Sequence, residues 1–192
     1  MRLLKIFSMI LLLALLPIKS FAAAPEISYD KMNFNFLKGY YTLTGNVRVA
    51  MDNHGYKMIL TADEAQVSLL QKKCTASGKV TLNHEDITFS CDKAFAEWES
   101  NSADIVGKIN FKSKDNITIT SDTAQYNWND RIADFYGNVK VTLGKNFTVD
   151  KNLKPGKKDI YAHVRYNIDE NKILALDKNF DIPKITIPNF EN

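Results

Sequence analysis

The sequence has little of what marks several common classes of protein. Its 192 residues include only two cysteines, eight glycines and five prolines, too few for a disulfide scaffold or a disordered linker. After residue 22, no apolar run is long enough to cross a bilayer as a helix, which takes about 20 residues. No G-x-S-x-G motif, Cys–His arrangement or phosphate-binding loop is present. The sequence therefore predicts no enzyme, no cofactor and no metal site.

Residues 1–22 have the composition of a secretory signal peptide. Arg2 and Lys5 supply a basic start, residues 6–18 form an apolar stretch of 13, and small residues follow at positions 20 and 22. The apolar stretch is short for a membrane span and contains a proline near its end. We therefore expect cleavage after residue 22 or 23, which leaves 23–192 as one exported domain. The alternative is an uncleaved membrane anchor.

Loss of this leader changes the charge balance. The whole chain has 25 Lys and Arg against 22 Asp and Glu, but Arg2, Lys5 and Lys19 lie in the leader, which has no acidic residue. The remaining chain has 22 residues of each sign. It lacks the basic excess that is typical of nucleic-acid-binding proteins, so we expect no nucleic-acid partner.

What the sequence does have is an internal repeat. The hexapeptides TGNVRV, SGKVTL, VGKINF and YGNVKV recur at intervals of 33, 29 and 30 residues. Fifteen residues before the glycine of each hexapeptide stands an aspartate. Repeats of this period predict stacked structural units. The glycines are Gly45, Gly78, Gly107 and Gly137, and the aspartates are Asp30, Asp63, Asp92 and Asp122.

A fifth, degenerate copy covers about residues 160–187. Ala162 replaces its aspartate, and Lys178 replaces its glycine. Terminal repeats are often atypical because they cap the stack. We therefore expect a single domain that ends in a degenerate repeat.

Apolar and polar residues alternate around these markers, with the period of a β-strand. The alternation reverses near each aspartate, as in a β-bulge that bends a strand, and again at the predicted turns 37–40, 70–73, 99–102 and 129–132. Residues 62–73, the best candidate for a helix, align with strand residues of the sister repeats. The residues predicted to face inward are Phe34, Phe36, Val47, Val49, Met58, Leu60, Val67, Leu69, Val80, Leu82, Ile87, Phe89, Trp98, Ile109, Phe111, Ile117, Ile119, Tyr126, Trp128, Val139 and Val141.

Hairpin pairing across these turns places each glycine opposite the residue two after the aspartate, for example Gly137 opposite Ala124. Two small residues then face each other on the inner side of the sheet, where large side chains beside a bend would collide. The glycines and aspartates are thus predicted to form the crease of an antiparallel sheet folded into a V. Its edges are predicted to be the first strand, at 26–30, and the last, at 180–187, which two prolines blunt.

This pattern resembles the OstA/LptA family of periplasmic lipopolysaccharide-transport proteins. The G-N-V-x-V strands and the upstream D-x-A carry the resemblance over residues 27–143. It implies an all-β fold, an OstA/LptA-like β-jellyroll that is open like a taco. The resemblance also implies that the inner residues bind the acyl chains of lipid A, and that the protein carries lipopolysaccharide from the inner to the outer membrane.

The resemblance implies partners as well. These are lipopolysaccharide, an inner-membrane LptC-type protein and an outer-membrane LptD-type protein, each protein joined by edge-strand pairing, and further copies stacked head to tail. The related LptC has the same fold and keeps an N-terminal anchor, so an LptC-like tethered component is one alternative. A structural cell-envelope domain with a closed core is another, and a polysaccharide-active solenoid enzyme is a third. Many small interior residues at the open side would favour a lipid carrier over a closed domain.

Several smaller features have two interpretations. The aspartates could bind a metal, but one per repeat at a bend favours acceptance of backbone N–H groups freed by a bulge. Cys74 and Cys91 could form a disulfide, but the predicted register leaves them four residues apart. The lysine-rich segment 140–158 favours a solvated loop over a site for lipid A phosphates, and its lysines are Lys140, Lys145, Lys151, Lys154, Lys157 and Lys158.

Overall fold

The computed structural model describes residues 26–53, 56–68, 70–84, 87–97, 99–113, 117–144, 148–149, 153 and 159–188. These residues form twelve β-strands, which confirms the all-β prediction. Within them no helix is long and apolar enough to cross a membrane. The strands are β1 (Glu26–Ser28), β2 (Lys31–Asn35), β3 (Tyr40–Asn53), β4 (Tyr56–Ser68), β5 (Lys73–His84), β6 (Ile87–Glu97), β7 (Ser102–Lys112), β8 (Thr118–Asn127), β9 (Ile132–Thr142), β10 (Thr148–Val149), β11 (Ile160–Asn167) and β12 (Lys172–Asp177).

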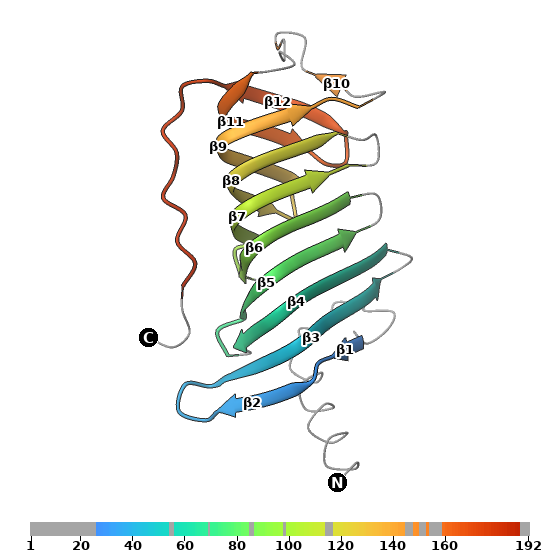
Figure 1. Ribbon diagram of the computed structural model, residues 1–192, viewed down its shortest axis with the longest axis vertical. Coiled ribbons are helices and arrows are strands. Elements are labelled where there is room, and N and C mark those ends of the chain that lie inside the picture. Colours follow the sequence, from blue (N-terminus) through green and yellow to red (C-terminus); the bar gives the residue numbers. More distant parts are fainter. Residues whose placement is uncertain are drawn as a thin grey trace.

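All twelve strands belong to one sheet, which is an antiparallel meander over most of its length (Figure 1). From β3 to β9 each strand pairs with its neighbours in the chain, and β9 then pairs with β11 and β11 with β12. At the N-terminal end, β1 and β2 both pair with β3, as two pieces of one broken strand. At the other end, β10 lies parallel to β12. Residues 62–73, which align with strand residues of the sister repeats, supply the end of β4 and the start of β5, as that alignment predicts.

The sheet bends at the aspartates, where the register changes between neighbouring strands. Between β5 and β6, Gly78 and Lys79 together oppose the single residue Asp92. Two residues against one define a β-bulge, which bends and twists a strand. On β4, the alternation of inward and outward side chains reverses at Asp63. Ala62 and Ala65 show this, because they are three residues apart and both are buried. The bulge is thus where the sequence predicts it, although the extra residue lies on the glycine strand.

The predicted partner of the glycine is wrong. Ala124 pairs with Phe135, and a Cβ built on Gly137 would lie 2.8 Å from Oδ2 of Asp122. The glycine therefore faces the exposed carboxylate outside the bend, and not an alanine inside it. The register differs because the turn occupies residues 128–131, one residue earlier than predicted. Moving a hairpin turn by one residue shifts the cross-strand pairing by two.

The inner face of the sheet forms one large core and one small one. The large core extends from Ala62 on β4 to Ile173 on β12. The small core, near the N-terminal end, consists of Leu43, Val47 and Ala65, with Ile27 packed against it. Burial of apolar side chains therefore increases along the sheet toward its C-terminal strands.

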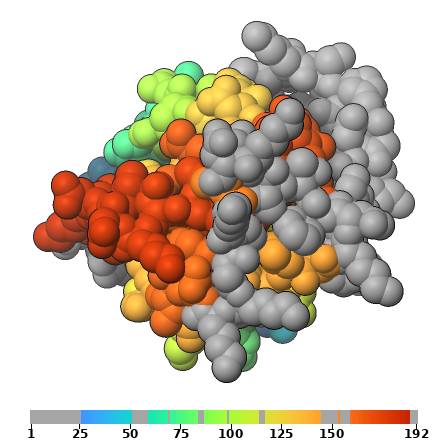
Figure 2. Space-filling view, turned by 90° about the horizontal axis from the view of Figure 1, so that it is seen from above, coloured from blue at the N-terminus to red at the C-terminus, as the bar shows by residue number. Residues whose placement is uncertain are grey.

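The C-terminal segment differs from the predicted last strand. After β12 ends at Asp177, residues 178–188 contain no strand. They run back along the outside of the sheet toward its N-terminal end (Figure 1) and protrude on one side when the molecule is seen from above (Figure 2). Pro183 and Pro188 lack the N–H groups that a sheet ladder needs, which explains why this segment does not pair.

Candidate functional site: a graded apolar groove

One wall of the folded sheet carries an unbroken row of large apolar residues from β3 to β9. Each member is the cross-strand partner of the next, and all are among the predicted inner residues. Side chains at such positions lie on one face and pack directly. The row is therefore a continuous apolar strip, made of Val49, Leu60, Leu82, Phe89, Phe111, Ile119 and Val141.

The facing wall has small residues across its middle strands. Two parallel rows of cross-strand partners lie there: Ala65, Ala76 and Ala94 on β4 to β6, and Cys74, Ala96 and Ala103 on β5 to β7. The first row continues with Ile105 on β7, and the second begins at Val67 on β4. The two walls meet farther along, where the ring of Phe89 on the first wall stacks on Phe135 of the second, with centroids 6.2 Å apart. Small side chains on one wall leave room for the large side chains of the other.

Among the described residues of the first-wall row, solvent exposure is greatest at the N-terminal strands. In the first-wall row, Val49, Leu60 and Leu82 are half-buried, whereas Phe89 is 8% exposed and Phe111 is 0% exposed. The gradient follows the strand order from β3 to β7. Among the described residues, the inner face between the two walls is thus partly exposed near the N-terminal strands and buried near the C-terminal ones. We call this inner face the groove.

Aromatic rings close the groove at its C-terminal half. Phe111 lies 5.9 Å from Phe89, 5.5 Å from Phe135 and 5.4 Å from Tyr166 between ring centroids. Phe135 and Tyr166 are 0% exposed. The hydroxyl group of Tyr166 donates to the side-chain oxygen of Asn171, which also accepts from Ser113. Such edge-to-face rings add stability beyond the area they bury.

The remaining predicted inner residues differ in how far they are buried. Val47, Val80, Ile87, Ile109, Ile117 and Val139 are buried, and Phe34, Val67, Tyr126 and Trp128 are half-buried. Phe36 is 86% exposed, so its predicted inner position is wrong: it lies in the turn 36–39, one residue outside the strand alternation. Trp128 also lies in a turn, where its indole N–H donates to Asn101 at 3.2 Å. Leu69, Trp98 and the side chain of Met58 lie outside the described residues.

The prediction omitted several inner residues. Leu43, Ile105 and Phe135 each stand two residues before a repeat glycine and are buried. Val164 and Tyr166, from the degenerate repeat, are 0% exposed. The sequence could have identified Leu43, Ile105 and Phe135. They stand four and six residues before the inward residues that follow each glycine by two and four, and side chains at every second residue of a strand share a face.

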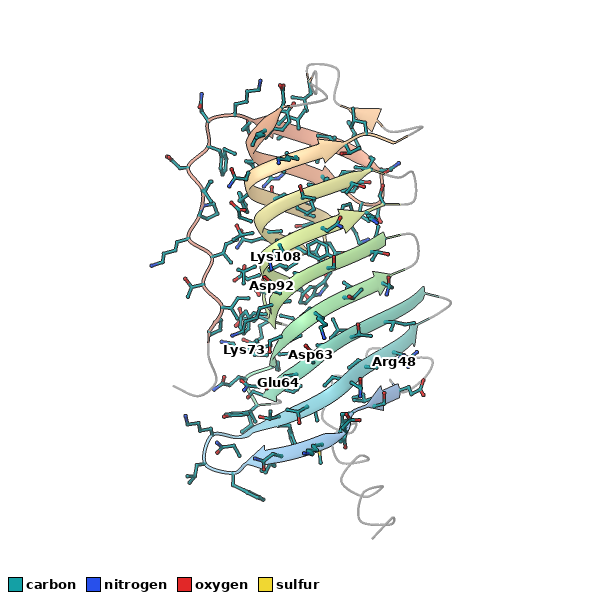
Figure 3. The ribbon with its side chains drawn as sticks, viewed as in Figure 1. Arg48, Asp63, Glu64, Lys73, Asp92 and Lys108 are labelled. Carbon is teal, nitrogen blue, oxygen red and sulfur yellow. The ribbon has the colours of Figure 1, made fainter. Side chains whose placement is uncertain are left out.

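The aspartates lie outside the bend, where each carries an exposed carboxylate. Figure 3 shows Asp63, Asp92 and Lys108 along one side of the stacked strands. The described partners of these carboxylates come from the residue after each glycine: Asn46 donates to Asp30 at 3.0 Å and Asn138 to Asp122 at 2.7 Å. The sequence predicts backbone N–H donors for these carboxylates, whereas the described donors at Asp30 and Asp122 are side-chain amides. Among the described residues, no cluster of three or more His, Cys, Asp or Glu side chains could hold a metal ion.

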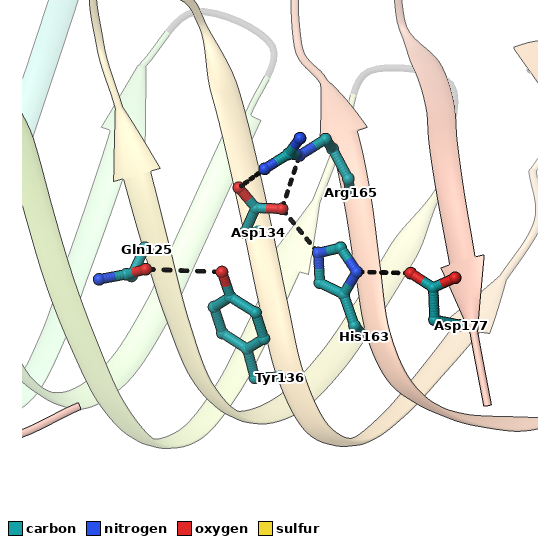
Figure 4. Close-up of polar contacts among 6 residues, drawn as sticks. All are labelled: Gln125, Asp134, Tyr136, His163, Arg165 and Asp177. Atoms are coloured by element: carbon teal, nitrogen blue, oxygen red, sulfur yellow. Dashed lines mark hydrogen bonds and ion pairs between the residues drawn. The ribbon is translucent and has the colours of Figure 1, made fainter. Parts of the chain in front are cut away.

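A polar cluster that the sequence did not predict lies between β9, β11 and β12 (Figure 4). Nε2 of His163 is 2.7 Å from Oδ1 of Asp134, and Nδ1 is 2.8 Å from Oδ2 of Asp177. Arg165 donates to both oxygens of Asp134, at 2.8 and 3.1 Å. No sequence motif connects these residues, because only the pairing of three strands brings them together.

The geometry of this cluster favours a charged imidazole. Both ring nitrogens of His163 face carboxylates, as two donors require. Burial lowers the pKa of His163, but the hydrogen bonds to Asp134 and Asp177 outweigh burial and raise the pKa above its ordinary value. For Asp134, burial raises the pKa, but the bonds from His163 and Arg165 outweigh it and lower the pKa. The ring of Phe180 stacks on His163 at 4.3 Å and ties the C-terminal segment to the cluster.

Cys74 and Cys91 are free thiols. Cys91 pairs with Val80, six residues beyond Cys74 on the same strand, so the two are farther out of register than the predicted four residues. Burial raises the pKa of each thiol to about 12. Buried thiols of this kind are unreactive. Of the predicted basic segment, Lys145, Lys151, Lys154, Lys157 and Lys158 lie outside the described residues.

Comparison with known proteins identifies the family. The OstA-like protein family matches residues 56–175, which is more than half of the chain. The chain belongs to the OstA-like family. The resemblance inferred from the repeated glycines and aspartates is therefore confirmed, and with it the folded, open antiparallel sheet of an OstA/LptA-like protein.

Among solved structures, the chain is similar to LptH from Pseudomonas aeruginosa, described as the LptA-homologous periplasmic component of the conserved lipopolysaccharide transport device. The identity is 12%, the TM-score is 0.47, and the match covers 73% of this chain and 94% of that one. A likeness at this level carries no conclusion about what this OstA-like chain binds. No curated protein matches the sequence.

Proposed function

We propose that this OstA-like protein is a periplasmic carrier that binds lipopolysaccharide and holds its acyl chains in the groove. The single observation that supports this most directly is the graded interior. Large apolar residues on one wall face small ones on the other, and solvent reaches Val49, Leu60 and Leu82 at the N-terminal end. The small residues are the feature that favours a lipid carrier over a closed structural domain.

The physical driving force would be the transfer of methylene groups from water to an apolar groove. Each buried CH₂ contributes about 0.8 kcal/mol, so a long acyl chain gains much even from partial shielding. The inner rows from β3 to β9 contain no charged residue, as an acyl-chain site requires. The sequence contains no ATP site, so directed movement would take its energy from partners.

Free strand edges would supply the contacts with those partners. Among the described strands, β1 and β2 each pair only with β3, which leaves their outer edge available. An extended strand can add to such an edge through backbone hydrogen bonds. We propose that an LptC-type protein of the inner membrane and an LptD-type protein of the outer membrane use the two ends of the sheet. Copies of this chain stacked head to tail would join by the same contacts.

Photo-crosslinking tests the carrier proposal. A photoreactive residue at Leu82 points into the groove, and one at Thr81 points outward from the same strand, opposite Thr61 and Ser90. We expect crosslinks to lipopolysaccharide from Leu82 and none from Thr81. Equal crosslinking from both positions would contradict binding in the groove, and crosslinks from Thr81 alone would place the lipid on the outer face.

A second candidate function is a structural envelope domain with a closed interior. The fully buried rings of Phe111, Phe135 and Tyr166 favour it for the C-terminal half of the sheet. In that case neither Leu82 nor Thr81 would crosslink to lipopolysaccharide in a folded protein. An LptC-like tethered component is the other alternative. N-terminal sequencing of the exported protein decides it, since a chain starting at residue 23 or 24 excludes a retained anchor.

A further inference from the structure

Three large apolar side chains protrude from one end of the sheet. Phe36, Leu37 and Leu70 are 86%, 99% and 86% exposed, more than any other large apolar side chain among the described residues. They lie in the β2–β3 and β4–β5 turns, the first two on this side of the sheet. A Cβ built on Gly39 would lie 3.4 Å from Cδ1 of Leu70, so the two turns are in contact. We call Phe36, Leu37, Lys38, Gly39 and Leu70 the N-terminal rim.

The rim is flanked by positive charge. Residues 31–47 contain Lys31 and Lys38 and no acidic residue, and residues 68–76 contain two lysines and no acidic residue. Both of these lysines are paired with the next turn region. Lys72 lies 3.2 Å from Glu99, with both side chains at least half exposed, and Lys73 lies 3.0 Å from Glu97, with both about one-third exposed. Such surface pairs contribute little.

The later turns on the same side have fewer exposed apolar residues and more acidic ones. The β6–β7 turn has Glu99, the β8–β9 turn has Asp130 next to Arg131, and the β11–β12 turn has Asp169 and Glu170. Lysine without an acidic residue in the same turn is thus confined to the first two of these five turns. Exposed apolar tips beside lysines are typical of surfaces that enter the interface of an anionic membrane.

A path of aromatic rings leads from the rim into the groove. The ring of Phe36 packs edge-on against Phe34, with centroids 4.5 Å apart, and Phe34 lies 4.4 Å from Tyr41. Tyr41 is the cross-strand partner of Val67, and Val67 is the partner of Cys74 on the small-residue wall. The exposed tip is therefore continuous with the open end of the groove.

We propose that the N-terminal rim docks on the surface of an anionic lipid bilayer. Phe36, Leu37 and Leu70 enter the boundary between headgroups and acyl chains, and the flanking lysines contact lipid phosphates. Passage of an acyl chain along Phe36, Phe34 and Tyr41 into the groove rests on the proposed function, but the docking itself does not.

Vesicle flotation tests the docking. The exported chain is mixed with vesicles of equal parts phosphatidylethanolamine and phosphatidylglycerol, or with vesicles of phosphatidylcholine alone. We expect flotation with the anionic vesicles and little with the neutral ones. The triple variant Phe36→Ser, Leu37→Ser, Leu70→Ser should lose about tenfold or more in partitioning, and Lys38→Glu should weaken binding to anionic vesicles only.

The control removes exposed apolar side chains elsewhere. Ile160 and Ile182 are 52% and 48% exposed and lie away from the rim, so Ile160→Ser with Ile182→Ser should float like the wild type. Circular dichroism and urea unfolding should be unchanged in both variants, because the replaced side chains are exposed.

Two outcomes would overturn the docking proposal. They are a wild-type protein that does not float and a triple variant that floats like the wild type. If that variant also loses self-association, the rim is a contact between copies of the chain. Crosslinking of soluble lipopolysaccharide at Leu82 reports separately on the proposed function, so either inference can fail while the other stands.

Discussion

The carboxylate of Asp122 occupies the place that a side chain on Gly137 would fill. A Cβ on Gly137 would lie 2.8 Å from Oδ2 of Asp122, and the same approach recurs in each repeat, at 2.3, 2.6 and 2.5 Å. The glycine has a φ of +72°, in the left-handed region. The fixed offset of fifteen residues in the sequence is therefore a direct contact across each hairpin. It explains why both residue types recur together.

Replacement of a bend glycine should be costly. Gly107 has a φ of +82°, and its Cβ would lie 2.5 Å from Oδ2 of Asp92. We expect Gly107→Ala to lower the free energy of unfolding by about 2–3 kcal/mol, as measured by urea denaturation. Gly39→Ala is the matched control, because Gly39 has a φ of +67° with its nearest neighbour at 3.4 Å. It should lose only about 1 kcal/mol.

The double variant Gly107→Ala, Asp92→Ala separates the clash from the backbone strain. It should recover part of the stability that Gly107→Ala loses. Equal losses at Gly107 and Gly39 would show that the aspartate contact contributes nothing.

The aromatic cluster should carry much of the stability of the C-terminal half. Phe135→Ala removes a ring that is 0% exposed and packs against Phe89 and Phe111. We expect a loss of about 3–5 kcal/mol in the free energy of unfolding. Phe36→Ala removes the same ring at 86% exposure and should change stability by less than about 0.5 kcal/mol. A small effect at Phe135 would mean that the C-terminal half of the groove is loosely packed.

Stability should depend on pH through His163. Its pKa is raised in the folded protein by hydrogen bonds to Asp134 and Asp177, which outweigh the effect of burial. The stabilisation is therefore complete below the unfolded value of about 6.5 and is lost as the pH rises through the raised folded value. We expect the urea midpoint to fall over that range in the wild type, and less in His163→Gln. Equal pH slopes in the two proteins would contradict the charged imidazole.

At acidic pH, stability should fall as the pH falls, through Asp134. The pKa of Asp134 is lowered because the bonds from His163 and Arg165 outweigh burial. Its stabilisation is present above about pH 3.9, the unfolded value, and is lost as the pH falls through the lowered folded value. In Asp134→Asn, the urea midpoint should fall less than in the wild type as the pH is lowered through this range. An equal fall in both proteins would assign acid unfolding to other carboxylates.

The two thiols should react only when the protein opens. Burial raises the pKa of Cys74 and Cys91 to about 12, so both are protonated at neutral pH. We expect slow reaction with a thiol reagent at pH 8 in buffer and rapid reaction of two thiols in urea. Cys91→Ser isolates Cys74, the less buried of the two. Absence of reactive thiols in urea without reductant would indicate a disulfide instead.

The repeats, the bends and the apolar row could all be predicted from the sequence, because each depends on local pattern. Alternation with period two identifies strands and their inner faces, and the aspartate–glycine spacing marks each bend. The register could not be predicted, because it depends on where each turn closes. Arg131 and Lys72 end their turns with φ of +56° and +52°, and neither residue type gives a sequence signal for a left-handed conformation.

Only the tertiary structure decided which part of the groove is buried and which part is exposed to solvent. Whether an inward residue is closed off or open to solvent depends on the wall that faces it, which lies many strands away in the sequence. Phe89 is closed because Phe135 stacks on it, while Leu60 at the other end stays half-buried. Likewise, His163 meets Asp134 and Asp177 only because strand pairing aligns them. The alternation of inward and outward residues can be predicted from the sequence. Burial of the groove and the charge pairs around His163 arise only when strands distant in the sequence pack together.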